Sequence, residues 1–107
     1  MGDNAGVAQP TALIYAYVEG MSERRAPHRE GHLALIERWR ADGRLRMAGA
    51  LGNPPEGGLL VFEVDDPAEV EDFVAADPYV EAGLVVDSRI EPWTMVANVA
   101  LTGASEG

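Results

Sequence analysis

Two residue types are missing from this chain of 107 residues: cysteine and lysine. Without cysteine the chain has no thiolate nucleophile, no thiolate zinc site, no iron–sulfur cluster and no disulfide. Without lysine it has no Schiff-base amine, no lysine-bound pyridoxal phosphate and no Walker-type phosphate loop. The chemistry that remains is proton transfer by His, Asp, Glu and Tyr, assisted by Arg.

Positive charge and long apolar runs are also scarce. Eight Arg stand against 18 Asp and Glu, which gives a formal net charge of −10. A phosphate backbone or an anionic bilayer would be repelled by most of this surface, so we expect no nucleic-acid and no membrane partner. No apolar run approaches the roughly 20 residues that cross a bilayer, and Asp3 stands where a signal peptide would be basic. We therefore expect a cytoplasmic protein.

The first elements along the chain are a strand and a helix. Residues 11–18 (TALIYAYV) are rich in β-branched and aromatic types and end before Gly20, which predicts a strand. Pro27 suits a first helical turn, because its missing N–H has no partner there, and Gly43 suits the position after a helix end. The spacing therefore predicts a helix over 27–42.

A hairpin, a second helix and a last strand follow. Asp66, Pro67 and Glu69 form an N-cap, a first-turn proline and an acidic third position, so the second helix begins there. It ends at Asp77, because Pro78 pushes the preceding residue out of the helical region. The remaining strands are expected at 44–51, 58–64 and 84–90, and 93–99 extends or repeats the last one.

This order predicts one α+β domain of the ferredoxin-like type, βαββαβ, with two helices on one face of an antiparallel sheet. The domain is expected at 11–99, between flexible tails at 1–10 and 100–107. Two helices cover one sheet face, yet the first and third strands are apolar on both. We expect the uncovered face to pack against a second copy, as a homodimer.

The helical spacing of the first helix places His32 on the same stripe as Leu35, Ile36 and Trp39. A buried imidazole needs a partner for its N–H, and Asp77, fixed by Pro78 at a helix exit, is the best candidate. Such a pair fixes the tautomer and makes the ring a general base. The alternative is a structural core histidine bonded to backbone.

Other polar residues carry weaker signals. His28 and His32 stand four apart, as two metal ligands on a helix do, but the pattern is not HExxH, so we expect no metal. Arg24, Arg25 and Arg29 form a basic cluster that either binds a substrate anion or is a solvated loop, the second being favoured for the first two. Tyr15 and Tyr17 share a strand face that lines a pocket or packs in the core or a dimer.

Several short motifs, spread over about residues 12 to 97, occur in a recognisable order. They are Arg29-x-x-His32-Leu33, Gly43-Arg44-Leu45, Ala48-Gly49-Ala50-Leu51, Gly58, Asp77-Pro78-Tyr79, Ala82-Gly83-Leu84 and Pro92-Trp93. As a set they resemble the YciI-like (YCII-related) family. The resemblance implies a dimeric α/β barrel and a pocket with a His and Asp pair, which maps onto His32 and Asp77. It also implies an activity similar to the cofactor-free dehydrochlorination of a chlorinated hydroxyhydroquinone.

These observations lead to a hypothesis of a cofactor-independent enzyme that performs elimination, isomerisation or cyclisation on a small aromatic or enolisable metabolite. His32 and Asp77 are its expected catalytic pair, and the expected substrate-binding residues are Arg29, Tyr15, Tyr17, Tyr79 and Trp93. Two alternatives stay open: a noncatalytic module that binds a small molecule or a protein, and a cofactor-free monooxygenase-like enzyme.

Overall fold

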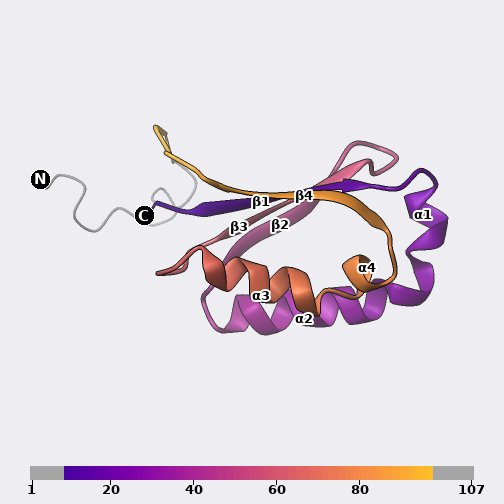
Figure 1. The fold of residues 1–107 in the computed structure, drawn as a ribbon, viewed down its shortest axis with the longest axis horizontal. Coiled ribbons are helices and arrows are strands. Elements are labelled where there is room, and N and C mark those ends of the chain that lie inside the picture. The colour runs from indigo at the N-terminus through magenta and orange to yellow at the C-terminus, as the bar shows by residue number, and fades with distance from the viewer. Residues whose placement is uncertain (1–8, 98–107) are drawn as a thin grey trace, which may run out of the picture.

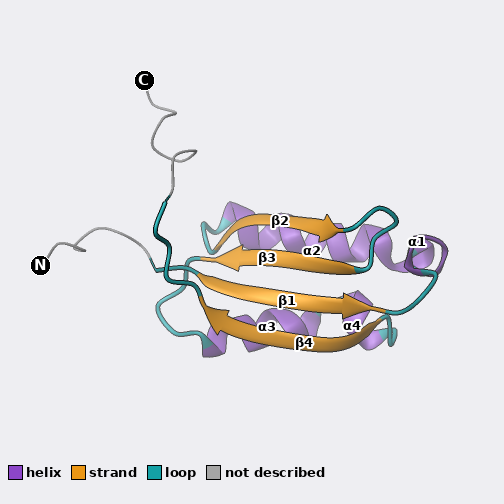
Figure 2. Cartoon of the chain, turned by 90° about the horizontal axis from the view of Figure 1, so that it is seen from above, coloured by secondary structure: helices purple, strands orange, loops and turns teal. Residues whose placement is uncertain are grey.

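The computed structural model describes residues 9–97 and has the expected ferredoxin-like α+β fold. Four antiparallel strands form one sheet in the order β2-β3-β1-β4 (Figure 2). The helices all lie on one side of that sheet (Figure 1). The elements are β1 (Thr11–Tyr17), α1 (Met21–Arg24), the 3₁₀ turn η1 (Ala26–His28), α2 (Arg29–Ala41), β2 (Leu45–Leu51), β3 (Gly57–Phe62), α3 (Ala68–Ala76), α4 (Pro78–Glu81) and β4 (Val85–Pro92).

The core lies between the sheet and the two longer helices, α2 and α3. Leu13 of β1 and Phe62 of β3 are fully buried there, because alternate strand residues point toward the helices. Trp39 of α2 meets Phe62 and Phe73 edge-on, with ring centroids 5.7 and 5.4 Å apart. This aromatic cluster fixes α2 and α3 on the sheet, and so sets where their ends meet.

The segment before α2 differs from the expected single helix over 27–42. Gly20 adopts φ 75°, a left-handed conformation that suits glycine and turns the chain directly into α1. Met21 of α1 is 1 % exposed and anchors this turn. Pro27 then occupies a separate 3₁₀ turn, and the α-helix proper begins at Arg29. The proline marks a helical start, as expected, but of η1 and not of α2.

The second half of the chain has one helix more than expected. The Asp66 carboxylate accepts the N–H of Ala68 at 2.9 Å and so caps the start of α3. The helix ends at Ala76, and Asp77 is extended (ψ 119°), as expected of a residue before proline. Pro78 then begins the one-turn helix α4. Its four residues are too few to show a helical period, so the sequence pattern does not predict this helix.

Strand β4 ends the sheet, and the expected strand over 93–99 is absent from residues 93–97. Because β4 runs antiparallel to β1, Pro92 pairs with Thr11. Beyond that pair, the backbone N–H of Trp93 donates a hydrogen bond to the backbone oxygen of Pro10. The rest of that predicted strand, like residues 1–8 and 100–107 of the expected tails, lies outside the described residues. None of the helices within residues 9–97 is both long and apolar enough to span a membrane.

The sheet face opposite the helices carries apolar side chains at its centre. Strand alternation places Ile14, Leu59 and Val61 there, with the more exposed Met47 and Leu51 on the outer strand β2. The ion pairs Arg46–Glu63 and Arg89–Glu91 lie on β2–β3 and β4 beside this apolar strip. We call these five apolar residues the open face.

Candidate active site

His32 and Asp77 lie in direct contact, although they are 45 residues apart. His32 projects from the first turns of α2 and Asp77 from the junction of α3 and α4. Their Nδ1 and Oδ1 atoms are 2.8 Å apart. His32 is 6 % exposed and Asp77 0 %. Gly31 allows this approach, because a Cβ at its position would lie 3.2 Å from Cγ of Pro78.

The Asp77 carboxylate has three hydrogen-bond partners. Besides His32 it accepts the Tyr15 hydroxyl on Oδ2 at 2.8 Å and the backbone N–H of Tyr79 on Oδ1 at 3.0 Å. An ionised carboxylate has acceptors and no donor, so Asp77 accepts a hydrogen bond from the imidazole ring as well. The Nδ1–H of His32 therefore donates to Asp77, and Nε2 is left with its lone pair.

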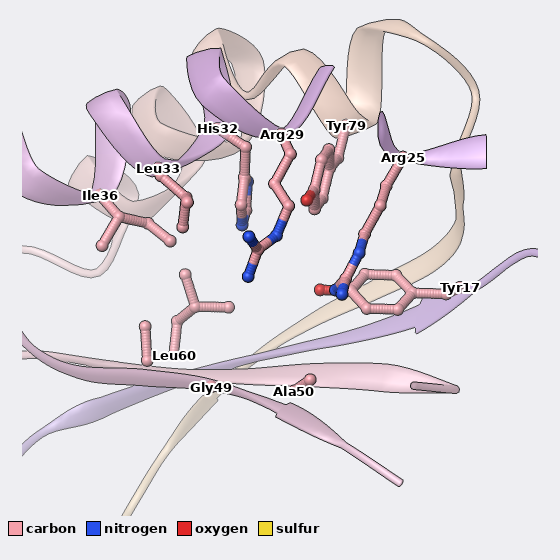
Figure 3. A pocket seen from close by; sticks show the side chains of 11 residues that line it. Tyr17, Arg25, Arg29, His32, Leu33, Ile36, Gly49, Ala50, Leu60 and Tyr79 are labelled. Atoms are coloured by element: carbon pink, nitrogen blue, oxygen red, sulfur yellow. The ribbon is translucent and has the colours of Figure 1, made fainter. Parts of the chain in front are cut away.

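A cavity of about 210 Å³ lies between α2 and the sheet, next to this pair. His32 forms part of its wall, with its ring edge directed inward (Figure 3). One end is polar and the other is apolar, and the side chains of α2 and of strands β2 and β3 face one another across it. The lining residues are Tyr17, Arg25, Arg29, His32, Leu33, Ile36, Ala48, Gly49, Ala50, Leu60 and Tyr79.

Aromatic packing holds the imidazole in place. The Tyr79 ring lies flat on the His32 ring, with centroids 3.7 Å apart and planes 9° from parallel. Tyr17 meets Tyr79 edge-on at 6.1 Å. The Tyr17 hydroxyl lies over Gly58, where a Cβ would come within 2.6 Å of it. Glycine at 58 therefore makes room for this hydroxyl.

The three tyrosines are all held in the protonated form. Burial raises the pKa of Tyr17 to about 12, and the neighbouring Tyr79 and Asp77 add to the rise while Arg25 opposes it. Burial also raises the pKa of Tyr79, against the positive charges of Arg25 and Arg29. For Tyr15, burial and the Asp77 charge both raise the pKa. At neutral pH each phenol keeps its proton, so the Tyr17 and Tyr79 hydroxyls are hydrogen-bond donors available to a ligand.

Comparison with known proteins assigns the chain to a family. The family model of the YCII-related domain matches residues 9–94. The chain belongs to this family. A curated relative from Haemophilus influenzae, an uncharacterised protein, is 35 % identical over 83 residues, which is 69 % of this chain and 85 % of the relative.

A solved structure with the same fold is 5-chloro-2-hydroxyhydroquinone dehydrochlorinase (TftG) from Burkholderia phenoliruptrix AC1100, in complex with 2,5-dihydroxybenzoquinone. It superimposes on this YCII-related domain with a TM-score of 0.69 at 23 % identity, covering 81 % of this chain and 95 % of the other. At that identity the likeness concerns the fold.

Not every residue expected to bind substrate lines the cavity of this YCII-related domain. Arg29, Tyr17 and Tyr79 do. Tyr15 does not: it is 2 % exposed and lies behind Asp77, because strand β1 carries it under the helices. Trp93 does not either, since the antiparallel course of β4 takes it to the opposite end of β1 from Tyr17.

Arg25, for which the sequence favours a solvated loop, is half-buried and lines the cavity beside Arg29. Its neighbour Arg24 is exposed and lies outside the cavity lining. Arg25 lies at the junction of α1 and η1, before α2 begins, so the helical spacing of α2 could not assign it to the cavity. Within residues 9–97 no three His, Asp or Glu side chains cluster as metal ligands, and the cavity contains His32 but not His28.

Proposed function

We propose that this YCII-related domain is a cofactor-independent enzyme that transfers a proton to or from a small aromatic or enolisable metabolite. His32 is the general base or acid, and Asp77 is its orienting partner. The reaction is an elimination, an isomerisation or a cyclisation, each of which begins when a C–H or O–H proton is removed.

The observation that carries the proposal is the hydrogen bond from His32 Nδ1 to a fully buried carboxylate, while the same ring borders a cavity. The bond directs the Nε2 lone pair away from Asp77, and the negative charge of Asp77 stabilises the imidazolium formed when Nε2 takes a proton. A merely structural histidine gains nothing from an adjacent cavity. The three-partner carboxylate and the stacked Tyr79 limit ring rotation, so the base keeps one orientation.

Removal of a C–H proton leaves an enolate and removal of a phenol O–H proton leaves a phenolate, and the cavity offers groups that stabilise either anion. Arg29 supplies positive charge and the Tyr17 and Tyr79 hydroxyls supply donors near His32. Tyr15 acts indirectly, because its hydroxyl donates a hydrogen bond to Asp77 and does not contact the substrate. Proton transfer of this kind needs no redox or carrier group, so these side chains suffice for the chemistry.

The activity for which TftG is named supports the reaction class. A dehydrochlorinase removes a proton and a chloride from its substrate, and the proton needs a base. TftG shares the fold of this chain, and 2,5-dihydroxybenzoquinone, found in its complex, is a planar six-membered ring of the size class proposed here.

We also propose that the functional unit is a homodimer in which the open face packs on its counterpart. Ile14, Leu59 and Val61 form an apolar centre with ion pairs beside it, the arrangement typical of interfaces with an apolar core and a charged rim. A second copy of the same sheet is self-complementary to such a strip.

Turnover assays on a defined panel test the enzymatic proposal. The panel contains 5-chloro-2-hydroxyhydroquinone, read by chloride release, and phenylpyruvate, read by exchange of its C–H for deuterium in heavy water. We expect acceleration of at least one reaction without oxygen uptake, and a loss of about 10² to 10⁴ in rate for His32→Gln. Arg38→Gln, on the same helix but outside the cavity, is the control and keeps the rate.

The proposal is contradicted if His32→Gln turns over as fast as the parent chain. Turnover that consumes oxygen stoichiometrically would instead point to the monooxygenase-like alternative. Tight binding of a panel member without any turnover would point to the binding module.

A further inference from the structure

Arg25 and Arg29 have no carboxylate partner among the described residues; Arg24 and Arg38 have none either, but of these four only Arg25 and Arg29 line the cavity. Four of the eight arginines form ion pairs there: Arg40 with Glu37, Arg44 with Asp42, Arg46 with Glu63 and Arg89 with Glu91. In a chain with 18 acidic residues, partners are plentiful. Arg25 and Arg29 instead extend into the cavity that contains His32 (Figure 3).

The polar end of the cavity is built from donors. A guanidinium has five N–H donors and no acceptor, and the Tyr17 and Tyr79 phenols keep their protons because burial raises their pKa values. No carboxylate lines the cavity, since Asp77 lies behind the His32 ring. A site with two positive charges and two hydroxyl donors is complementary to a ligand oxygen that is negatively charged.

The other end of the cavity is apolar. Leu33 and Ile36 of α2 face Leu60 of β3 (Figure 3), and Ala48, which pairs with Leu60, also lines the cavity. Their side chains can neither donate nor accept, so this end suits a hydrocarbon or ring surface. Leu33 is still 43 % exposed, so a ligand here would cover apolar surface that water now contacts.

The cavity volume limits the ligand. A protein cavity of about 150 Å³ accepts benzene. A cavity of about 210 Å³ therefore holds one six-membered ring with one or two small polar substituents. Nucleotides and coenzyme A thioesters are larger than this space.

We propose that the cavity binds a small single-ring anion, with the ring between Leu33, Ile36 and Leu60 and its anionic oxygen between Arg25 and Arg29. The inference rests on the proposed function and specifies its substrate class. His32 Nε2 lies at the boundary of the two ends, beside the ring carbons next to the anionic substituent. Arg25 is then a specificity-determining residue that selects anions over neutral rings of the same shape.

Calorimetric titration with two matched probes tests this inference. Benzoate carries the anion, and benzamide has nearly the same shape without the charge. We expect the parent chain to bind benzoate at least tenfold more tightly than benzamide, and added salt to weaken benzoate binding alone. Arg25→Gln and Arg29→Gln should each weaken benzoate binding about tenfold or more, the effect of losing a charged hydrogen bond, and leave benzamide binding unchanged.

Arg38→Gln is the matched control, because it removes the same charge from α2 at a position outside the cavity lining. Equal binding of the two probes, no binding of benzoate at millimolar concentration, or an equal loss in Arg38→Gln would overturn the inference. The salt dependence is measured on the parent chain, so it decides the matter even where a variant folds poorly.

A third variant separates this inference from the enzymatic proposal. His32→Gln leaves both arginines in place, so it should keep the preference for benzoate while it loses turnover. Anion selectivity that depends on Arg25, in a protein without turnover, would uphold the binding inference and overturn the enzymatic proposal. Turnover that depends on His32, on neutral rings and without anion preference, would do the reverse.

Discussion

The Tyr79 ring lies flat against the His32 imidazole, 3.7 Å from it, while the backbone N–H of Tyr79 binds the carboxylate that holds His32. One short turn, Asp77-Pro78-Tyr79, therefore contacts the histidine both at its Nδ1 edge and on its face. The same Asp77 oxygen caps the one-turn helix α4. The helix cap and the orientation of the candidate base depend on one residue, so they are expected to fail together.

Substitutions of Asp77 should separate these two roles. Asp77→Asn keeps a good N-cap and nearly the same shape but removes the charge that stabilises an imidazolium. We expect the fold to persist and turnover to fall about tenfold or more. Asp77→Ala leaves the buried Tyr15 hydroxyl and His32 Nδ1 without their partner, which costs about 1–3 kcal/mol for each group. Thermal unfolding and turnover measured on the same samples distinguish the two variants, and equal stability of both would contradict this account.

The raised tyrosine pKa values predict a loss of stability in alkali. A group whose pKa is higher in the folded chain holds its proton more tightly there, so its contribution is complete below the unfolded pKa. For Tyr17 that contribution is lost as the pH rises from its ordinary pKa of 10.0 to about 12. Tyr15 and Tyr79 act in the same direction.

Denaturant titrations from about pH 8 to about pH 11 check this prediction, because ordinary phenols titrate near pH 10. The free energy of unfolding should be nearly constant at first and fall steeply above about pH 10. Tyr17→Phe, which has no hydroxyl to ionise, should show a shallower fall. A flat profile through pH 11 would speak against the buried, protonated tyrosines.

Gly57 and Gly49 form a matched pair for testing the packing under the site. A Cβ at Gly57 would lie 2.5 Å from the backbone oxygen of Tyr15, whereas a Cβ at Gly49 meets nothing within 4 Å. Gly57→Ala therefore forces β1 and β3 apart near Tyr15 and should destabilise the fold by roughly 1–3 kcal/mol. Gly49→Ala should stay within about 0.5 kcal/mol of the parent. The reverse order in thermal unfolding would show that the strands do not approach in this way.

The open face predicts the mass in solution. Light scattering at micromolar concentration should give twice the monomer mass of 11.4 kDa. Leu59→Glu places a charge at the centre of the apolar strip and should produce monomers, since burying an unpaired charge is costly. Ala34→Glu adds the same charge on the exposed side of α2 and should leave the dimer intact. A parent chain that stays monomeric would defeat the proposal.

The sequence predicted the order and type of the main elements because turn residues mark their ends. Gly43 follows α2 with a left-handed φ of 84°, and Pro78 limits α3, each by a local backbone constraint. The helices α1 and α4 were not predicted, because each is a single turn of four residues and is too short to show a helical period.

Part of the candidate site could also be predicted from the sequence. The stripe of α2 predicted that His32 faces inward, and the proline after Asp77 predicted a fixed carboxylate, and the expected contact is present. The sequence did not predict how deeply each tyrosine is buried. Strand alternation assigns Tyr15 and Tyr17 to one face, but it does not say that Tyr15 lies behind Asp77. Nor does alternation say which end of β1 receives Trp93, since that depends on how β4 pairs with it.

The most direct test of the central claim needs no substrate. The account requires the neutral His32 ring to carry its proton on Nδ1, bound to Asp77, and to leave Nε2 bare toward the cavity. Nitrogen-15 NMR of histidine-labelled protein, with His28→Gln to remove the second imidazole, reports which ring nitrogen bears the proton. We predict a protonated Nδ1 whose hydrogen exchanges slowly, with this preference weakened in Asp77→Asn. A neutral ring protonated on Nε2 would contradict the account, because the nitrogen facing the cavity would then have no lone pair with which to accept a proton.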